Sequence, residues 1–385
     1  MSILLTEEQQ LIGQSARDFA KEYLEPMVLE MDRTGQYPAA VVKQLAAQDF
    51  LGLFLAGEYG GAEAGYVSLV EVVENLSRVS AAVASIMVNH ALAAYAIQRW
   101  GSPEQKKTCL PKLAAGEVLG AFAVFEHGPT PGVGAGALMA TKLPEGWALK
   151  GTKAFVRNAG AADVYLVFGI IRPEPDNTRL TCFIVDAGTS GLAVGPRLDT
   201  MGLKACPVAH LTFKSVAVAE AGVMGSEHNA SGMASQILSA GAVAEGAQTV
   251  GIARAAAEHA ADYAKHRVQF RHPIARLQAI QTLLAEIVSD SHVAWLGVQH
   301  AARLIEDNAP FEPEAAMVKL FLGRFGSKML VDAIQIEGGM GICEVVPKHI
   351  SGALPLARMF RDIAGTTLLD APDDFPEKII AAGIA

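Results

Sequence analysis

The stretch that decides the fold lies near the end of the chain and reads Gln335-Ile336-Glu337-Gly338-Gly339-Met340-Gly341, then Ala357-Arg358-Met359-Phe360-Arg361-Asp362-Ile363-Ala364-Gly365-Thr366-Thr367. Before it, apolar residues recur at helical spacing and predict a helix over residues 311–336. Gly338 and Gly339 are expected to end that helix, and glycines let a backbone approach a ligand closely because they carry no Cβ. An irregular connection and a second turn at Gly365-Thr366 are expected to follow.

Composition narrows the class of protein. The chain has 385 residues, 51% of them hydrophobic and 18% charged, which is enough for a large core in two or three structural units. A formal net charge of −9 without a long basic run argues against a nucleic-acid surface. Four scattered cysteines without CxxC spacing favour reduced thiols in a cytoplasmic protein over disulfides or a metal site. No signal peptide is evident, and no apolar run is expected to span a membrane.

Helical patterns occupy both ends of the chain and enclose a region of strand-like patterns. Thr6 and Ser102 stand where helix N-caps are expected. Short apolar runs bounded by turn residues predict strands between residues 120 and 218, and long helical patterns return from Ser231. The prediction is an α+β fold with an N-terminal helical domain over residues 1–119, a central β domain over 120–228 and a C-terminal four-helix bundle over 229–385.

Six segments resemble the acyl-CoA dehydrogenase family and occur in the family's order along nearly the whole chain. They are Glu58–Gly61 (EYGG), Ser102–Glu117 (SPEQKKTCLPKLAAGE), Lys153–Asp163 (KAFVRNAGAAD), Met201–Val218 (MGLKACPVAHLTFKSVAV), Arg267–Gln278 (RVQFRHPIARLQ) and Gln335–Gly341 (QIEGGMG). The resemblance implies the three-domain fold predicted above, assembled as a tetramer. It also implies a chemistry, in which a carboxylate removes the α-proton of an acyl-CoA thioester while FAD takes the β-hydride. Electron-transfer flavoprotein is then the expected electron acceptor.

In this family each FAD lies across a subunit boundary. One chain holds the isoalloxazine ring beside the substrate and the base, and its neighbour holds the adenine and pyrophosphate end. We use "ring side" and "adenine side" for the residues that match these two parts of the site. Fold alone does not guarantee the reaction, so each position has to be compared with the family.

The adenine side matches the family well. Arg267 falls at a pyrophosphate-binding arginine, a role that suits the fork of donors on a guanidinium. Arg271 is a departure, because the family usually has glycine there. Singly, Arg267 and Gln335 are ordinary surface residues, but their register with the family favours binding. The matching residues are Arg267, Phe270, Gln278, Gln335, Gly338 and Gly339.

The ring side departs from the family. The segment that hydrogen-bonds the flavin ring, Thr-Glu-Pro in the family, reads Phe125-Glu126-His127, and proline and glycine around residues 129–136 replace Gly-Ser-Asp. Phe155 keeps an aromatic ring that can stack on a flavin. Arg157 puts a bulky cation where the family has a small hydroxyl that meets flavin N5, and could fill the place of the ring. The ring side therefore consists of Phe125, Phe155, Arg157 and Thr366 in degenerate form.

The catalytic base is also missing. Counting back from Gly365-Thr366, the family's glutamate falls on Ala364, whose methyl group cannot take a proton. Some members carry the base on the helix after the β domain, just before a substrate-binding arginine. Those two positions read Gly241 and Ala242, and the aspartate three residues before the arginine reads Ser239.

Other titratable residues could serve instead. Asp362 is the nearest candidate for a substitute base, and a gapped alignment would move the base to Asp370. Glu126, His127 and Glu245 are also expected near the site. A paired structural carboxylate is favoured for Glu245, and a loop residue for His127.

The contrast between the two sides suggests a subunit of a heteromeric acyl-CoA dehydrogenase, two plus two, that completes the FAD site of a catalytic partner. The acyl-CoA substrate would then bind in the partner's site. Paired dehydrogenases of this kind resemble those that shorten steroid and bile-acid side chains. A second hypothesis is a self-sufficient homomeric flavoenzyme, using Asp362 as base or a desulfinase-like reaction that needs none. A third is a non-catalytic scaffold on an enzyme fold.

Overall fold

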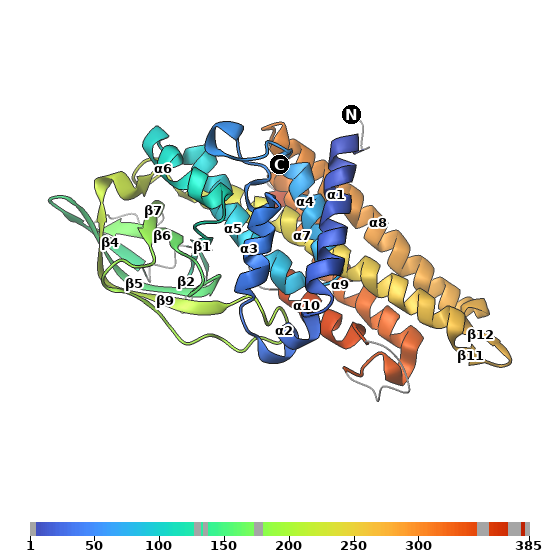
Figure 1. The fold of residues 1–385 in the computed structure, drawn as a ribbon. Helices are drawn as coiled ribbons and strands as arrows, with labels where there is room; N and C mark the ends of the chain where they lie inside the picture. Colours follow the sequence, from blue (N-terminus) through green and yellow to red (C-terminus); the bar gives the residue numbers. More distant parts are fainter. Residues whose placement is uncertain are drawn as a thin grey trace.

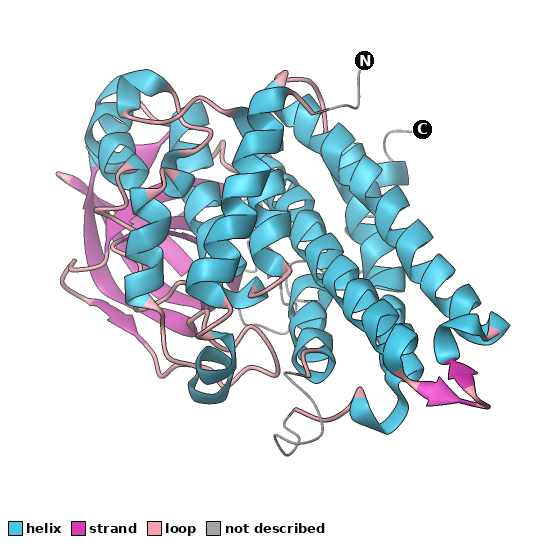
Figure 2. Ribbon diagram, turned by 45° about the vertical axis from the view of Figure 1, so that its right-hand side comes forward, coloured by secondary structure: helices cyan, strands magenta, loops and turns pink. Residues whose placement is uncertain are grey.

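The computed structural model describes residues 5–126, 132–133, 138–172, 180–344, 354–368 and 379–381. Helices from both ends of the chain form one body, and the sheet lies against one end of it (Figure 1). Turning the molecule shows the same layers, with the strands on one side and the long helices running away from them (Figure 2). This confirms the α+β fold with helices, strands and helices in that order.

The N-terminal helices begin and end where the sequence signals place them. Thr6 and Ser102 each form a capping box with a glutamine three residues on, as predicted. The turn Ala20–Leu24 continues the first helix and ends before Pro26. The helices are α1 (Glu7–Phe19), α2 (Val28–Thr34), α3 (Ala39–Ala47), α4 (Gly65–Ser77), α5 (Ala81–Trp100) and α6 (Pro103–Ala114).

Helix α5 passes through the centre of the molecule. By length and composition it is apolar enough to cross a membrane, contrary to the expectation from sequence that no run would qualify. Within the fold, however, 94% of its apolar window is buried. The apolar character of α5 is therefore accounted for by packing against its neighbours, α4 and α7 (Ser231–His266) among them.

The central strands form one twisted sheet in the order β10-β7-β6-β4-β5-β9-β8, with β1 parallel to β6. The longest pair is β5 with β9, and it carries Arg157 at the end of β5. Residues 132–133 pair with β2 as the short strand β3. The strands are β1 (Gly120–Ala123), β2 (Phe125–Glu126), β3 (Gly132–Val133), β4 (Leu138–Leu143), β5 (Gly146–Arg157), β6 (Val164–Arg172), β7 (Leu180–Asp186), β8 (Leu192–Val194), β9 (Val208–Ala219) and β10 (Val223–Met224).

Four helices make up the C-terminal part: α7, α8 (Gln278–Glu306), α9 (Glu312–Glu337) and α10 (Leu356–Leu368). The predicted helix over 311–336 is α9, displaced by one residue. Between α7 and α8, strands β11 (Val268–Gln269) and β12 (His272–Pro273) form a hairpin that projects from the end of the helices (Figures 1 and 2).

The turn expected at Gly365-Thr366 is wrong, because both residues lie within α10. Leu356, Met359 and Ile363 are buried at helical spacing, and this apolar face holds the segment in a helix. Glycine is required at 365 for packing, since a Cβ there would stand 2.7 Å from Cδ1 of Leu203.

The segment around Leu203 is fastened to α10 through its backbone. Oδ1 of Asp362 accepts a hydrogen bond from the Leu203 amide at 2.7 Å. A Cβ on Gly202 would lie 2.1 Å from the carbonyl oxygen of Arg361. This contact therefore fixes the position of α10 relative to the segment around Leu203, and with it the position of residues 364–366.

We predict that Gly202→Ala destabilises the protein by about 2 kcal/mol or more, because the added methyl group collides with a backbone carbonyl that cannot turn away. Gly232→Ala is the matched control. Gly232 lies in the first turn of α7 with open space where a Cβ would be, so the melting temperature of this variant should be unchanged or slightly higher. Equal melting temperatures for the two variants in scanning fluorimetry would contradict this packing.

Candidate functional site

Three of the four predicted ring-side residues line one small cavity. Phe125, Phe155 and Arg157 from the sheet face Leu238, Gly241 and Glu245 of α7 and Asn89 and Leu92 of α5. The cavity measures about 30 Å³. Since a water molecule occupies about 30 Å³ in the liquid and drug-sized ligands need several hundred, the space fits little more than water. The sequence therefore identified residues that do come together, around a space that they largely fill themselves.

A buried ion cluster accounts for the lack of space. Nη1 of Arg157 donates to Oε1 of Glu245 at 2.5 Å, and Nζ of Lys319 donates to Oε2 of the same carboxylate at 3.1 Å. The Arg157 side chain is 8% exposed and that of Glu245 4%. We call Arg157, Glu245 and Lys319 the Arg157 cluster. Two cations on one shielded carboxylate hold the guanidinium in the cavity wall, where its bulk replaces ligand space.

The Arg157 cluster is tied to α10 as well. Lys319 donates to the carbonyl oxygen of Thr366 at 3.2 Å, and Arg157 approaches that of Gly365 at 3.4 Å. The Thr366 hydroxyl lies 2.9 Å from that of Thr249 on α7. Thr366 is thus buried in contacts within the protein, although its position matches the family.

Asp362, the predicted substitute base, does not reach the cavity. Its carboxylate is buried. Oδ1 accepts a hydrogen bond from the Leu203 amide, and Oδ2 accepts one from Nη1 of Arg358 at 3.0 Å. Burial raises the pKa of Asp362, while Arg358 and the backbone hydrogen bond act in the opposite direction. This geometry is that of a structural carboxylate that joins α10 to the segment before β9.

The remaining candidates are also occupied or lack a titratable group. Glu126 is fully buried and pairs with Nζ of Lys153 at 2.6 Å, and burial lowers the pKa of Lys153 to about 8. Glu245 is a paired structural carboxylate, as the sequence favoured. His127 and Asp370 lie outside the described residues. The positions where the family carries its base or its substrate-binding residues hold no carboxylate. They are occupied by Ala364 on α10 and by Ser239, Gly241 and Ala242 on α7.

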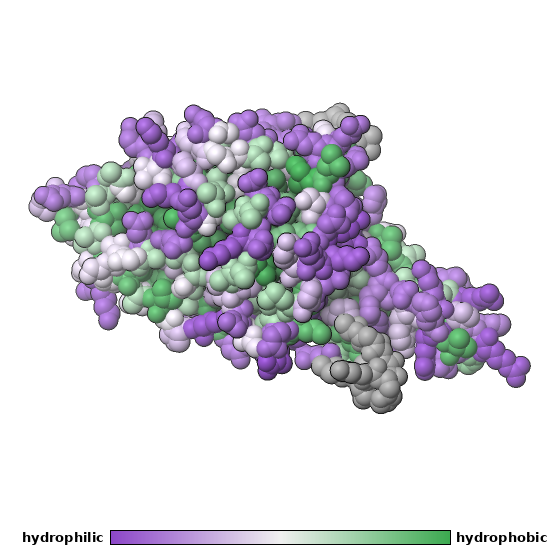
Figure 3. Space-filling model, in the orientation of Figure 1, coloured by the Kyte–Doolittle hydropathy of each residue, from purple (hydrophilic) through white to green (hydrophobic). Residues whose placement is uncertain are grey.

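The predicted adenine-side residues lie elsewhere, on the outside of the molecule. Arg267 and Gln278 flank the projecting hairpin, and the Phe270 side chain at its tip is 81% exposed. The hairpin end is mainly hydrophilic in colour, with a hydrophobic patch near its tip (Figure 3). Arg271 adopts φ +68°, a left-handed conformation that costs a residue with a Cβ and explains why the family has glycine there.

The end of α9 offers a second exposed segment. Gln335, Gly338 and Gly339 are all exposed, and Gly338 adopts φ +62°. A Cβ at either glycine would meet no atom within 4 Å. Packing inside this chain therefore does not require these glycines, although the φ of Gly338 favours one. An open glycine backbone of this kind suits close approach by a molecule from outside.

Glu337 lies just before these glycines and is 4% exposed. Neither of its carboxylate oxygens has a hydrogen-bond partner among the described residues, and Nε2 of His259 lies 3.2 Å from Oε1 without hydrogen-bond geometry. Burial raises the pKa of Glu337 to about 7 and lowers the pKa of His259. The end of α9 therefore changes charge near neutral pH.

Sequence reasoning missed two members of this site, Lys319 and Thr249. Lys319 stands between the apolar residues Val318 and Leu320 in helix α9, and that position was the available signal for a buried partner. Thr249 follows Glu245 by one helical turn and donates its hydroxyl to that residue's carbonyl oxygen at 2.9 Å. Neither residue belongs to a motif quoted above, so pattern matching did not draw attention to them.

Comparison with known proteins gives the family. The N-terminal, middle and C-terminal domains of acyl-CoA dehydrogenase match residues 6–117, 122–216 and 231–385. The chain belongs to the acyl-CoA dehydrogenase family. Members of this family are FAD-containing oxidoreductases.

Three relatives show how far the similarity extends. An acyl-CoA dehydrogenase of Bacillus subtilis is 34% identical over 98% of both chains. Butyryl-CoA dehydrogenase from Megasphaera elsdenii superposes with a TM-score of 0.92 at 30% identity, over 100% of both chains. A chain in the structure of the electron transferring flavoprotein of Acidaminococcus fermentans superposes with a TM-score of 0.93 at 28% identity, over 100% of this chain and 99% of that one. This acyl-CoA dehydrogenase family member thus resembles complete relatives from end to end.

We predict that Arg157→Met lowers the free energy of unfolding by about 3 kcal/mol, because Glu245 stays buried with one cation fewer. The double variant Arg157→Met/Glu245→Gln should recover at least half of this loss, since the unbalanced carboxylate is removed too. Urea unfolding of both variants and the wild-type chain measures the coupling. A single variant as stable as wild type would show that the cluster does not hold the cavity closed.

The pKa of Glu337 predicts a pH dependence of stability. Its folded pKa of about 7 lies above the usual 4.5, so folding binds a proton between these values. The contribution of protonated Glu337 to stability is present below about pH 4.5 and is lost as the pH rises through about 7. Glu337→Gln should therefore be more stable than wild type by about 2 kcal/mol at pH 8 and equal to it near pH 4.5. Thermal unfolding across this range tests the sign, and a pH-independent difference would contradict it.

Proposed function

We propose that this chain is one subunit of a heteromeric FAD-dependent acyl-CoA dehydrogenase, in which it completes the FAD site of a catalytic partner and has no working site of its own. The observation that carries the proposal is the contrast between the two sides of the flavin site. The ring side is filled by the Arg157 cluster, whereas the adenine side is exposed and matches the family.

The ring side does not fit a flavin ring. A flavin ring would fit only if Arg157 moved away from Glu245. That movement would separate a buried ion pair and leave the Glu245 carboxylate facing the apolar wall of the cavity. The base positions read alanine and glycine, and Asp362, Glu126 and Glu245 each bind a cation. We therefore derive no proton abstraction and no hydride transfer in this chain's own cavity.

The adenine side fits the other end of the cofactor. Arg267 offers an exposed guanidinium next to the hairpin that carries the exposed Phe270 and extends away from the body of the chain. Gly338 and Gly339 leave room for a pyrophosphate or adenine to approach the backbone. FAD shared in this way would supply hydride acceptance in the partner, and these residues would hold its adenine end.

The rest of the assembly follows from this arrangement. The catalytic partner would bind the acyl-CoA and carry the glutamate that takes the α-proton, two copies of each chain forming the heterotetramer. Electron-transfer flavoprotein is the proposed acceptor, which the fold similarity to a chain of the Acidaminococcus complex supports. We place the assembly in the cytoplasm.

A self-sufficient flavoenzyme is the second candidate. It is favoured by the full-length similarity, at 34% identity, to the Bacillus subtilis acyl-CoA dehydrogenase. That candidate requires Arg157 to move out of the cavity when flavin binds. It also requires another base, because Asp362 is held by Leu203 and Arg358.

Flavin content distinguishes these candidates. We predict that the chain expressed alone is colourless, and that co-expression with its partner gives about one FAD per two chains, because one ring side in each pair is closed. Arg267→Ala should strip most of the flavin from the complex, since it removes the phosphate contact. Lys265→Ala, which removes an exposed cation two residues away, is the control and should leave flavin content unchanged.

Absorbance near the flavin band, divided by protein concentration, gives the ratio. One FAD per copy of this chain when it is purified alone would overturn the proposal in favour of the self-sufficient enzyme. A complex without any flavin would favour the scaffold.

A further inference from the structure

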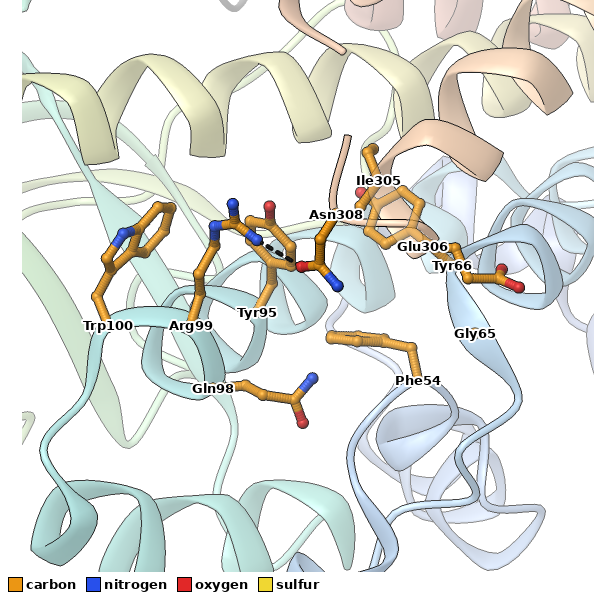
Figure 4. A pocket seen from close by; sticks show the side chains of 10 residues that line it. All are labelled: Phe54, Gly65, Tyr66, Tyr95, Gln98, Arg99, Trp100, Ile305, Glu306 and Asn308. Carbon is orange, nitrogen blue, oxygen red and sulfur yellow. Dashed lines mark hydrogen bonds between the residues drawn. The ribbon is translucent and has the colours of Figure 1, made fainter. Parts of the chain in front are cut away.

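A much larger cavity lies at the other end of α5. It measures about 590 Å³ and is bounded by three segments: the chain leading into α4, the last turn of α5, and the end of α8 with the turn after it. Figure 4 shows side chains from all three converging on one space, with Arg99 and Asn308 above it and Gln98 and Phe54 below. Its volume falls within the range of small-molecule sites, whereas the cavity beside Arg157 falls far below it.

Four of the residues that line the cavity are aromatic, and each of these rings contacts another. The ring of Tyr66 lies 6.0 Å from that of Phe54 and 6.1 Å from that of Tyr95, and Tyr95 meets Trp100 edge-to-face at 5.9 Å. Phe54, Tyr66 and Tyr95 are all buried, so their contacts fix the rings before any ligand arrives. A wall of fixed rings favours a flat apolar group over a flexible chain.

The carboxylate and side-chain amide oxygens of the cavity each already accept a hydrogen bond. Oε2 of Glu306 accepts from the Val67 amide at 3.0 Å, and Oε1 accepts from Arg303 at 3.0 Å. Oε1 of Gln98 accepts from the Ala56 amide at 2.9 Å. The side-chain oxygen of Asn308 accepts from Nη1 of Arg99 at 2.8 Å. Part of their accepting capacity is therefore used within the chain, and the charge of Glu306 is paired with Arg303.

Donors, by contrast, remain. The bond to Asn308 uses one of the five N–H groups of Arg99, and the side-chain amide NH₂ groups of Gln98 and Asn308 have no acceptor among the described residues. The Tyr95 hydroxyl is buried and has no hydrogen-bond partner among the described residues. Burial raises the pKa of Tyr95, so this group stays a protonated donor at neutral pH. The ligand should bring acceptors, and the charge on Arg99 favours an anion.

We propose that this cavity binds a small aromatic carboxylate, with the carboxylate on Arg99 and the ring against Tyr95 and Trp100. The site is separate from the flavin surfaces, and the proposal stands whether or not the chain works as a partner subunit. Asn89 and Leu92 of α5 line the cavity beside Arg157, while Tyr95 and Trp100 of the same helix line this one. A ligand here would therefore contact the helix that also borders the ring side.

Fluorine NMR and calorimetry on the full-length protein as purified, with its partner if it has one, test the proposal. The probe is 4-fluorobenzoate, with 4-fluorobenzylamine as its cationic counterpart. We expect saturable broadening and binding heat for the benzoate at millimolar concentration or below, and binding of the amine weaker by about tenfold or more. Equal binding of the two probes, or no saturable binding of the benzoate, would overturn the proposal.

Three variants locate the probe. Arg99→Gln removes the exposed cation and should weaken benzoate binding by about tenfold, because a charge-assisted contact is lost. Trp100→Leu removes one wall of the cavity and should weaken it as well. Lys107→Gln, which removes an exposed cation from α6 outside the cavity, is the matched control and should bind as wild type does. Wild-type affinity in both Arg99→Gln and Trp100→Leu would place the probe elsewhere and contradict the assignment.

Discussion

The ion pair between Arg157 and Glu245 governs the arrangement of this molecule. It joins the last residue of β5 to α7, and Lys319 extends it to α9 and to the backbone of α10. Four elements from distant parts of the sequence therefore meet at one shielded carboxylate. Breaking a buried pair is costly because it leaves an unbalanced charge, so the elements that carry it are held at one separation. A small hydroxyl at position 157 would leave the space open and the carboxylate paired with Lys319 alone.

This constraint explains why the two surfaces of the fold differ. On the inner surface the side chains satisfy one another: Arg157 with Glu245, Lys153 with Glu126, and Arg358 with Asp362. On the outer surface, Arg267, Phe270 and the glycines at the end of α9 face outward. Charged groups that are paired inside one chain contribute to its stability, whereas exposed groups are available to a neighbour. The family fold thus carries paired charges on its inner surface and exposed groups on its outer surface.

Much of the fold could be predicted from local sequence signals. Apolar periodicity located the long C-terminal helices to within a few residues, and the capping residues Thr6 and Ser102 marked helix starts correctly. The departure at Arg157 and the titratable Glu245 near the expected site were visible in the sequence, and the contact between them was found in the structure. Gly365 was mistaken for a turn, because its need for glycine comes from Leu203, a residue far away in the sequence. Lys319 could be suspected from its apolar neighbours on α9, but its pairing with Glu245 and the cavity beside Tyr95 depend on tertiary contacts that no local pattern reports.

The most direct measurement is a cryo-electron microscopy map of the complex that co-purifies with this chain, at a resolution that shows flavin rings. The account predicts flavin density with its ring in the partner and its adenine end beside Arg267 and Gly338, while Arg157 stays on Glu245 in this chain. An isoalloxazine ring beside Phe155, with Arg157 turned out of its pair, would contradict it.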